Sequence, residues 1–219
     1  MISIKNSIVL LLTLSLLITL PLISMAQKEV EMTEYMEARM LTLPENAPVL
    51  EEPFVVTSCG QSPGALLFKV NADQAGLEGE QIDRLQPEQL TDEEGKPKYG
   101  TVVVTTGTSL KGMGAAGIDV DDEVERCLSV IEKAKELGIK IVAAQIEGPA
   151  RRTDKYDEKS ITNVTPEADF LITRYDINWD GYFTETAKEN EIPQVFIQQT
   201  IEVQEILPEL FGKIESSDP

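Results

Sequence analysis

The chain has 219 residues, of which 38 are acidic and 19 basic, so its formal net charge is -19 at pH 7. A field of that sign repels nucleic acid and anionic lipid, and neither is an expected partner. No histidine is present, which excludes Ser-His-Asp and Cys-His catalysis and removes the commonest ligand of zinc and copper sites.

Residues 1–26 have the features of a secretory signal peptide. Lys5 precedes an apolar run from Ile8 to Leu20, and a small-residue exit ends at Ala26. We therefore expect cleavage after Ala26 and export to the periplasm or the cell exterior. The alternative is an uncleaved membrane anchor, because residues 8–26 can just cross a hydrocarbon core of roughly 30 Å.

The remaining chain divides into an acidic tether at residues 27–50, an α/β domain at 51–214 and a short tail at 215–219. Apolar and β-branched runs predict strands at 53–57, near 81–84, and at 101–106, 139–146, 168–173 and 193–197. Helical patterns start at Ser62, run through 121–137, end near Val164, and recur at 184–190 and 201–214. This alternation predicts a single domain with an open, doubly wound, mostly parallel sheet of about five or six strands, similar to flavodoxin or Rossmann folds.

Ligands of such sheets bind at the carboxyl ends of the strands, so the loops there are the place to seek a site. After the first strand come Ser58, Cys59, Gly60, Gln61 and Ser62, and Pro63 then favours a helix start. Free N–H groups and the helix dipole at such a start favour a bound anion. The competing interpretation is an ordinary helix start without a ligand.

A glycine-rich stretch, 107–117, follows the strand at 101–106. Its residues 112–117 match the letters of the dinucleotide fingerprint, but they lie past the strand end. The fingerprint also needs an acidic residue that closes the next strand about 20 positions later, and Glu147 comes too late for that. We therefore expect no nicotinamide cofactor. The stretch is interpreted as a flexible or ligand-covering loop, in which Gly112 and Gly114 are candidate ligand contacts and Lys111 can reach a bound anion.

Four cations, Lys111, Arg151, Arg152 and Arg174, are expected at this edge of a strongly acidic chain. Their clustering suggests a site for a carboxylate, phosphate or similar anion. Surface ion pairs with nearby acidic residues are the competing interpretation.

Asp176, Asn178 and Asp180 alternate ahead of Gly181, as in the first half of a calcium loop. The twelfth position is Lys188, where a bidentate acid belongs, and an Asx turn explains the same residues. Calcium is thus an alternative, and no other cofactor is expected.

Two cysteines cannot make a disulfide-rich scaffold. Cys127 falls on the apolar face of the helix at 121–137, which indicates core packing. Cys59 stands at a strand end just ahead of a helix start, where a thiolate is favoured.

The stretches Thr57 to Ala65 and Lys111 to Asp119, with Ala150 to Arg152 and the turn near Asn178, resemble a family of exported prokaryotic proteins known only as a domain of unknown function. The resemblance extends from about Pro53 to Phe211. It implies an exported α/β domain and no particular substrate or activity.

Two functions follow as hypotheses. The first is an exported small-ligand binding protein, for an anion, with its site at the carboxyl edge of the sheet. The second is a thiol-based redox or transfer protein that uses Cys59. No nucleophile elbow or paired-carboxylate motif is present, so a binding protein is favoured over an enzyme. The oligomeric state is left open.

Overall fold

The computed structural model describes residues 27–214. The expected signal segment and the C-terminal tail at 215–219 lie outside them. The described residues fall into two units, residues 27–38 and residues 39–214. In the first unit residues 27–37 are helical. The second contains the α/β domain and also residues 39–50, the later part of the segment interpreted as a tether. Within residues 27–214, no helix is both long and apolar enough to cross a membrane.

A six-stranded sheet forms the centre of the second unit, and all its neighbouring strands are parallel. Its order is β2-β1-β3-β4-β5-β6. The strands are β1 (Phe54–Cys59), β2 (Gly79–Gln81), β3 (Thr101–Thr106), β4 (Lys140–Gln145), β5 (Phe170–Arg174) and β6 (Gln194–Ile197). Apart from the short edge strand β2 they are almost fully buried, as the continuous apolar runs predict.

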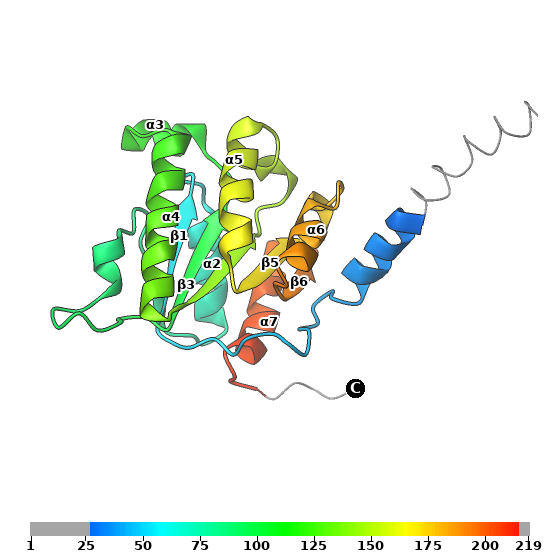
Figure 1. Ribbon diagram of the computed structural model, residues 1–219, viewed down its shortest axis with the longest axis horizontal. Coiled ribbons are helices and arrows are strands. Elements are labelled where there is room, and N and C mark those ends of the chain that lie inside the picture. The colour runs from blue at the N-terminus through cyan, green and yellow to red at the C-terminus, as the bar shows by residue number, and fades with distance from the viewer. Residues whose placement is uncertain (1–26, 215–219) are drawn as a thin grey trace, which may run out of the picture. The chain divides into compact units, whose positions relative to one another are not determined.

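Helices cover both faces of this sheet (Figure 1). They are α2 (Gly64–Gln74), α3 (Leu110–Ala116), α4 (Val120–Leu137), α5 (Lys155–Val164), α6 (Tyr182–Glu189) and α7 (Val203–Leu210). Phe68 of α2 and Leu207 of α7 share one apolar core, whereas Cys127 of α4 and Val164 of α5 belong to the core on the opposite face. The fold is therefore the doubly wound α/β arrangement that the sequence predicts.

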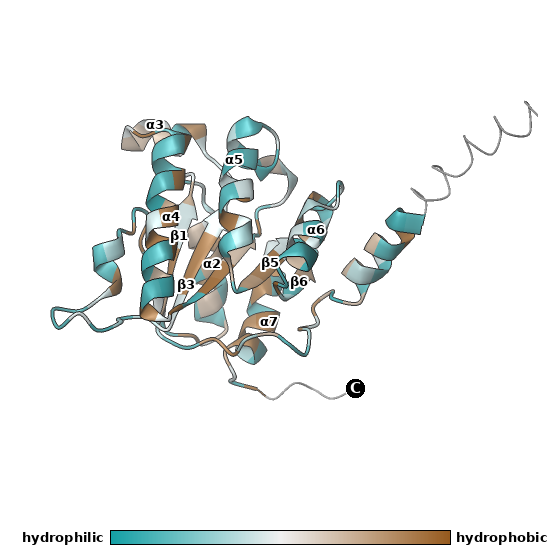
Figure 2. Cartoon of the chain, in the orientation of Figure 1, coloured by the Kyte–Doolittle hydropathy of each residue, from teal (hydrophilic) through white to brown (hydrophobic). Residues whose placement is uncertain are grey.

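The two helices α4 and α5 are amphipathic, with hydrophilic outer surfaces over hydrophobic strands (Figure 2). The carboxylate of Asp119 caps α4 by accepting from the backbone N–H groups of Asp121 and Asp122. Gly138, at φ 72°, ends it in the left-handed conformation, which costs glycine no Cβ clash. Residues 27–214 also contain five short 3-10 turns: η1 (Pro87–Leu90), η2 (Pro149–Arg151), η3 (Thr165–Glu167), η4 (Tyr175–Ile177) and η5 (Thr200–Glu202).

The glycine-rich stretch at 107–117 is partly helical, which corrects the expectation of a loop. Its residues 110–116 form α3, because the Ser109 hydroxyl accepts from the Gly112 N–H at 3.1 Å and Gly117 terminates the turn at φ 69°. The last helix is also shorter than predicted. It ends at Leu210, and Gly212 follows with φ 62°.

Candidate functional site

The loops after β1 and β3 meet at the carboxyl edge of the sheet, where the strand order reverses. Cys59 and Thr106, the last residues of these strands, are register partners. Beyond them Gln61 forms a backbone bridge with Thr108, and the Ser109 N–H donates to the Gly60 carbonyl at 2.8 Å. A crevice is the usual ligand site at such a reversal. Here the chain's own backbone spans the space between the two loops.

The start of α2 was expected to bind an anion, but hydrogen-bond acceptors from the protein itself already lie there. The Ser58 hydroxyl accepts from the Ser62 N–H at 3.1 Å, so Ser58 and Ser62 satisfy each other. A Cβ on Gly64 would lie 2.8 Å from Glu147 Oε1, which places this carboxylate directly against the first turn. The helix begins at Gly64 and Pro63 occupies the cap, one position later than predicted. A negative charge therefore already lies at this helix dipole.

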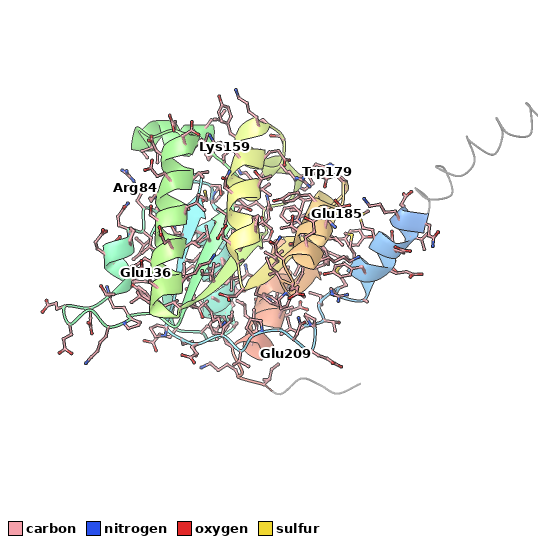
Figure 3. The ribbon with its side chains drawn as sticks, in the orientation of Figure 1. Arg84, Glu136, Lys159, Trp179, Glu185 and Glu209 are labelled. Atoms are coloured by element: carbon pink, nitrogen blue, oxygen red, sulfur yellow. The ribbon has the colours of Figure 1, made fainter. Side chains whose placement is uncertain are left out.

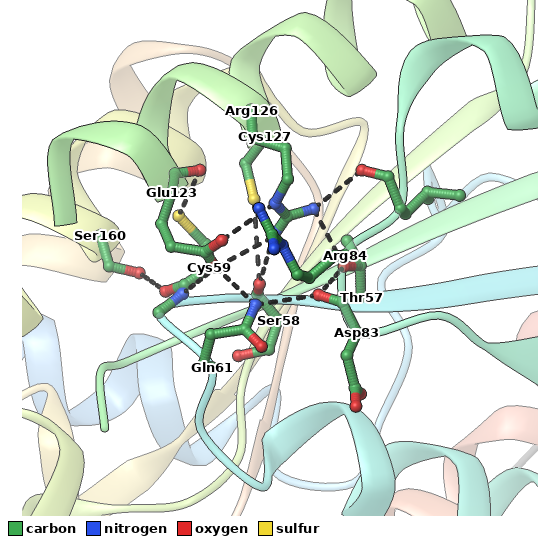
Figure 4. A network of polar contacts seen from close by, with 12 residues as sticks. Thr57, Ser58, Cys59, Gln61, Asp83, Arg84, Glu123, Arg126, Cys127 and Ser160 are labelled. Carbon is green, nitrogen blue, oxygen red and sulfur yellow. Dashed lines mark hydrogen bonds and ion pairs between the residues drawn. The ribbon is translucent and has the colours of Figure 1, made fainter. Parts of the chain in front are cut away.

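Below this edge lies a buried ion pair between Glu123 and Arg126 of α4 (Figure 4). The Glu123 carboxylate accepts from Arg126, from the Gly60 N–H at 2.9 Å and from Gln61 Nε2 at 3.0 Å. Arg126 in turn donates to the carbonyl of Ser58 at 2.6 Å. Gly60 and Gln61, predicted to contact a ligand, are thus bonded to α4.

Burial would raise the pKa of Glu123, but the hydrogen bonds from Arg126, Gln61 and Gly60 outweigh it and leave the pKa below its ordinary value. Sequence reasoning missed this pair, because charges three residues apart on a helix usually form a solvated surface pair. The available signal was its position beside Val124 and Cys127 on the apolar face of α4.

Both cysteines are fully buried, at 0% exposure. Cys127 lies in the core, where burial and a hydrogen bond with Cys59 raise its pKa well above the ordinary value. Ser160 of α5 donates its hydroxyl hydrogen to the Cys59 carbonyl at 2.5 Å. The interior position of Cys59 gives an external substrate no route to its sulfur in this conformation, so the thiol-transfer hypothesis gains no support from exposure.

The two neighbouring arginines have different environments. Arg151 donates from Nε to Glu147 at 3.1 Å and from Nη1 to the Thr108 carbonyl at 2.9 Å, and its side chain stays partly exposed. The Arg152 side chain is only 2% exposed and forms ion pairs with Glu158 and Asp180. The Arg152 guanidinium is therefore buried and bound to carboxylates of the protein. Of the two arginines, only Arg151 is accessible to a ligand at the predicted site.

Trp179, which is labelled in Figure 3, is 56% exposed. The centroid of its ring lies 4.8 Å from the Arg152 guanidinium carbon. Arg174, the fourth expected cation, forms an ion pair with Asp176. Paired charges of this kind are the competing interpretation that the sequence left open for the cation cluster. They account for Arg152 and Arg174, and Arg151 is also paired, with Glu147.

A pocket of about 430 Å³ lies between the chain after β3 and the chain after β4. Lys111 and Arg151 both line it. Lys111 has no ion pair within the described part of the chain. The full lining consists of Thr108, Ser109, Leu110, Lys111, Ala150, Arg151, Thr153, Asp154 and Asp157. Two of the expected cations thus share one hollow at the carboxyl edge.

The two carboxylates of the pocket are engaged by protein donors. Asp157 accepts from the N–H and the hydroxyl of Thr108, at 2.8 and 2.7 Å, and from the same two groups of Thr153. Burial would raise the pKa of Asp157, and these hydrogen bonds lower it overall. Asp154 caps α5 by accepting from the N–H groups of Tyr156 and Asp157. Sequence reasoning missed Thr108 and Asp157, because no motif links residues so far apart in the chain.

The glycines of α3 differ in their surroundings. A Cβ on Gly112 would collide with the backbone carbonyl of Gln61, whereas a Cβ on Gly114 would meet no atom within 4 Å. Gly112 therefore permits close approach between α3 and the loop after β1, not between α3 and a ligand.

The predicted calcium ligands are directed to different partners. Asp176 pairs with Arg174, and Asp180 pairs with Arg152. Asn178 accepts from the Phe183 N–H at 3.0 Å and donates to the Thr184 hydroxyl at 2.7 Å. Among residues 27–214, no group of three or more acidic, cysteine or histidine side chains is arranged to hold a metal ion. Side-chain bonds to the start of α6 hold this turn, and calcium stays a prediction.

Several solved structures are similar to the chain at low identity. A GDSL-like lipase from Bacteroides thetaiotaomicron is 18% identical with a TM-score of 0.33, and the match covers 65% of this chain and 66% of the lipase. A putative acylhydrolase from Bacteroides fragilis is 13% identical with a TM-score of 0.34, over 75% of each chain. The esterase EstA from Pseudoalteromonas is 8% identical with a TM-score of 0.33, over 74% of this chain and 98% of the esterase.

No curated protein matches the chain significantly. A family model does match, over residues 51–211, and its description is "Domain of unknown function (DUF6305)". This range includes every strand and all the helices from α2 to α7. The uncharacterised family that the sequence motifs suggest is therefore confirmed, and the chain belongs to the DUF6305 family.

Proposed function

We propose that this protein binds a small anion in the pocket between α3 and the loop after β4. The observation that carries the proposal is the shared lining by Lys111 and Arg151, at the sheet edge where α/β folds bind ligands. The volume of about 430 Å³ lies in the range of small-molecule sites.

The orientation of Arg151 supports this role. Bonds to Glu147 and to the Thr108 carbonyl hold its guanidinium in place, so little side-chain freedom is lost when a ligand binds. Its Nη2 makes no hydrogen bond to any residue in the described part of the chain. A planar guanidinium with free N–H groups suits a carboxylate or phosphate oxygen. Lys111, from the segment after β3, would add a second charge to the same pocket.

Acidic residues lie close to both cations, since Glu147 pairs with Arg151, and Asp154 and Asp157 line the same pocket. The oxygens of Asp157 accept four hydrogen bonds from Thr108 and Thr153, and Asp154 is occupied as the cap of α5. Their negative charge limits affinity, as does the net charge of -19. We therefore expect modest affinity that depends on both cations.

The signal-like segment with its apolar run from Ile8 to Leu20 supports a further part of the proposal, namely that the protein is exported. An exported binding protein with no catalytic motif would capture its ligand outside the cytoplasm. The test is the N-terminal sequence of the mature protein, which we expect to begin at Gln27 rather than at Met1.

Anion binding is testable by thermal unfolding of the protein with phosphate, sulfate and a panel of organic carboxylates, at constant ionic strength. A ligand at 100 times its dissociation constant should stabilise the protein by about 2.7 kcal/mol. The stabilisation should be lost in Lys111→Gln, which removes a charge without breaking an ion pair.

The control is Lys133→Gln, which alters a partly exposed lysine on α4 that pairs with Glu136 away from the pocket. It should retain the full ligand-induced shift. Equal stabilisation of wild type and Lys111→Gln by every anion that acts would contradict the proposed site.

A further inference from the structure

Two thiols face each other in the core between β1 and α4. Cys59 is the last residue of β1, and Cys127 lies in the middle of α4, which packs on that strand. Both are fully buried, and both are in the thiol form in this structure. The anion pocket does not include either of them.

Each of the two sulfur atoms lies near a backbone carbonyl close to the other cysteine (Figure 4). Cys59 Sγ lies 3.8 Å from the carbonyl oxygen of Glu123, one helical turn before Cys127. Cys127 Sγ lies 4.0 Å from the carbonyl oxygen of Ser58, the residue beside Cys59. Side chains on a helix lean toward its N-terminus, so the Cys127 side chain covers the turn that contains Glu123. Each sulfur therefore occupies the space next to the other cysteine.

We infer that Cys59 and Cys127 are partners of an intramolecular disulfide, which forms when the chain folds in the presence of a disulfide oxidant. In the first step the thiolate of one cysteine attacks a sulfur of the oxidant, here glutathione disulfide, and one glutathione thiolate leaves. In the second step the other cysteine attacks the mixed disulfide and releases the second glutathione. The two protein thiols lose two protons and two electrons, and one glutathione disulfide becomes two glutathione thiols.

The order of folding and oxidation decides whether the bond forms. In the folded protein neither sulfur is accessible, and the raised pKa of Cys127 keeps that group protonated and unreactive. Exchange therefore takes place while β1 and α4 are still apart or partly packed. A chain that folds while reduced retains two free thiols. The bond, once formed, ties the loop that carries Gly60 and Gln61 to α4 covalently.

The test uses the full chain, unfolded and reduced, and then refolded with glutathione disulfide. Intact-mass spectrometry should show a loss of about 2 Da, which corresponds to two hydrogens. Proteolysis without reductant should give one cross-linked peptide that contains both cysteines. The refolded oxidised protein should melt several degrees higher than the reduced protein, because the cross-link restricts the unfolded chain.

Two controls accompany this experiment. The same oxidant added to protein folded under reducing conditions should leave both thiols free, as measured by alkylation after denaturation. Cys59→Ala and Cys127→Ala should each give a glutathione adduct in place of the mass loss. The peptide map of wild type does not depend on whether these variants fold. Refolded wild type that keeps two free thiols, or forms only glutathione adducts or intermolecular disulfides, would overturn the inference.

Discussion

Single side chains of this protein illustrate how burial changes the role of a charge. Glu123 and Arg126 form a nearly fully buried pair, whereas Lys133 and Glu136 form an exposed pair on the same helix. Removing one partner of a buried pair leaves the other charge without compensation, at a cost of about 3 kcal/mol or more. We expect Glu123→Gln to lower the free energy of unfolding in urea by about that amount.

Glu136→Gln is the matched control on α4. An exposed pair contributes about 0–1 kcal/mol, so this variant should unfold almost as wild type does. Equal effects of Glu123→Gln and Glu136→Gln would show that the buried network does not stabilise the loop after β1.

The lowered pKa of Glu123 determines how the free energy of unfolding changes with pH. Burial opposes the shift, but hydrogen bonds from Arg126, Gln61 and Gly60 stabilise the carboxylate in the folded state. Its contribution is therefore complete above the ordinary pKa of 4.5 and is lost as the pH falls through the lower folded value. Urea unfolding from pH 6 down to about pH 3 should show a smaller loss of stability in Glu123→Gln than in wild type. Parallel curves for the two proteins would contradict this assignment.

Arg152 and Lys111 should separate stability from ligand binding. Arg152 is buried between Glu158 and Asp180, so Arg152→Met should destabilise the protein by about 3 kcal/mol and leave the anion-induced shift intact. Lys111→Gln should do the reverse, with a stability change within about 0.5 kcal/mol and loss of the anion-induced shift. Thermal unfolding of both variants, with and without anion, measures the two effects. If Arg152→Met stays folded but loses the anion-induced rise in melting temperature, Arg152 takes part in anion binding and this prediction is wrong.

At the scale of elements, α3 contains two glycines whose replacement by alanine should have opposite effects on stability. Gly112→Ala should destabilise the protein by about 1–3 kcal/mol, because the new methyl group would collide with the Gln61 carbonyl. Gly114→Ala should stabilise it by up to about 1 kcal/mol, because the site is open and alanine favours a helix. Urea unfolding measures both changes. A destabilised Gly114→Ala would show that α3 is not a helix in solution.

The major elements could be predicted from sequence because their signals are local. The buried strand at residues 101–106 coincides with β3, and Gly138 marks the end of α4 as predicted. The helix α3 was missed, because its glycines resemble a loop and only the Ser109 cap reveals the turn. Local patterns identify which long segments form helices and strands. They locate the ends less well, since α2 begins one residue later than predicted, and they carry less information about short elements.

The site was predicted only in part, since its contacts join distant residues. The sequence placed Lys111 and Arg151 at the same edge, and both line the pocket. It did not reveal that Glu147 covers the start of α2 or that Asp157 binds Thr108. Such pairings depend on the three-dimensional order of the strands, and no spacing along one chain encodes them.

For the whole molecule, the net charge of -19 should make stability depend on salt. Self-repulsion destabilises the compact state, and at about 0.15 M ionic strength charges more than roughly 8 Å apart are largely screened. We expect the melting temperature to rise steadily with sodium chloride, for wild type and Lys111→Gln alike. A melting temperature independent of salt would contradict this. Because salt alone raises the melting temperature, every anion titration needs a parallel titration with sodium chloride at the same ionic strength.

The central claim is the location of the anion site, and amide chemical-shift mapping of the isotope-labelled protein during a phosphate titration tests it most directly. At constant ionic strength, the amide signals of Lys111, Arg151 and Thr153 should move together along one saturable curve. The signal of Gly64, at the start of α2, should change little, because Glu147 already covers that turn. Saturable shifts centred on Gly64, or none at the pocket with any anion of the panel, would contradict the account.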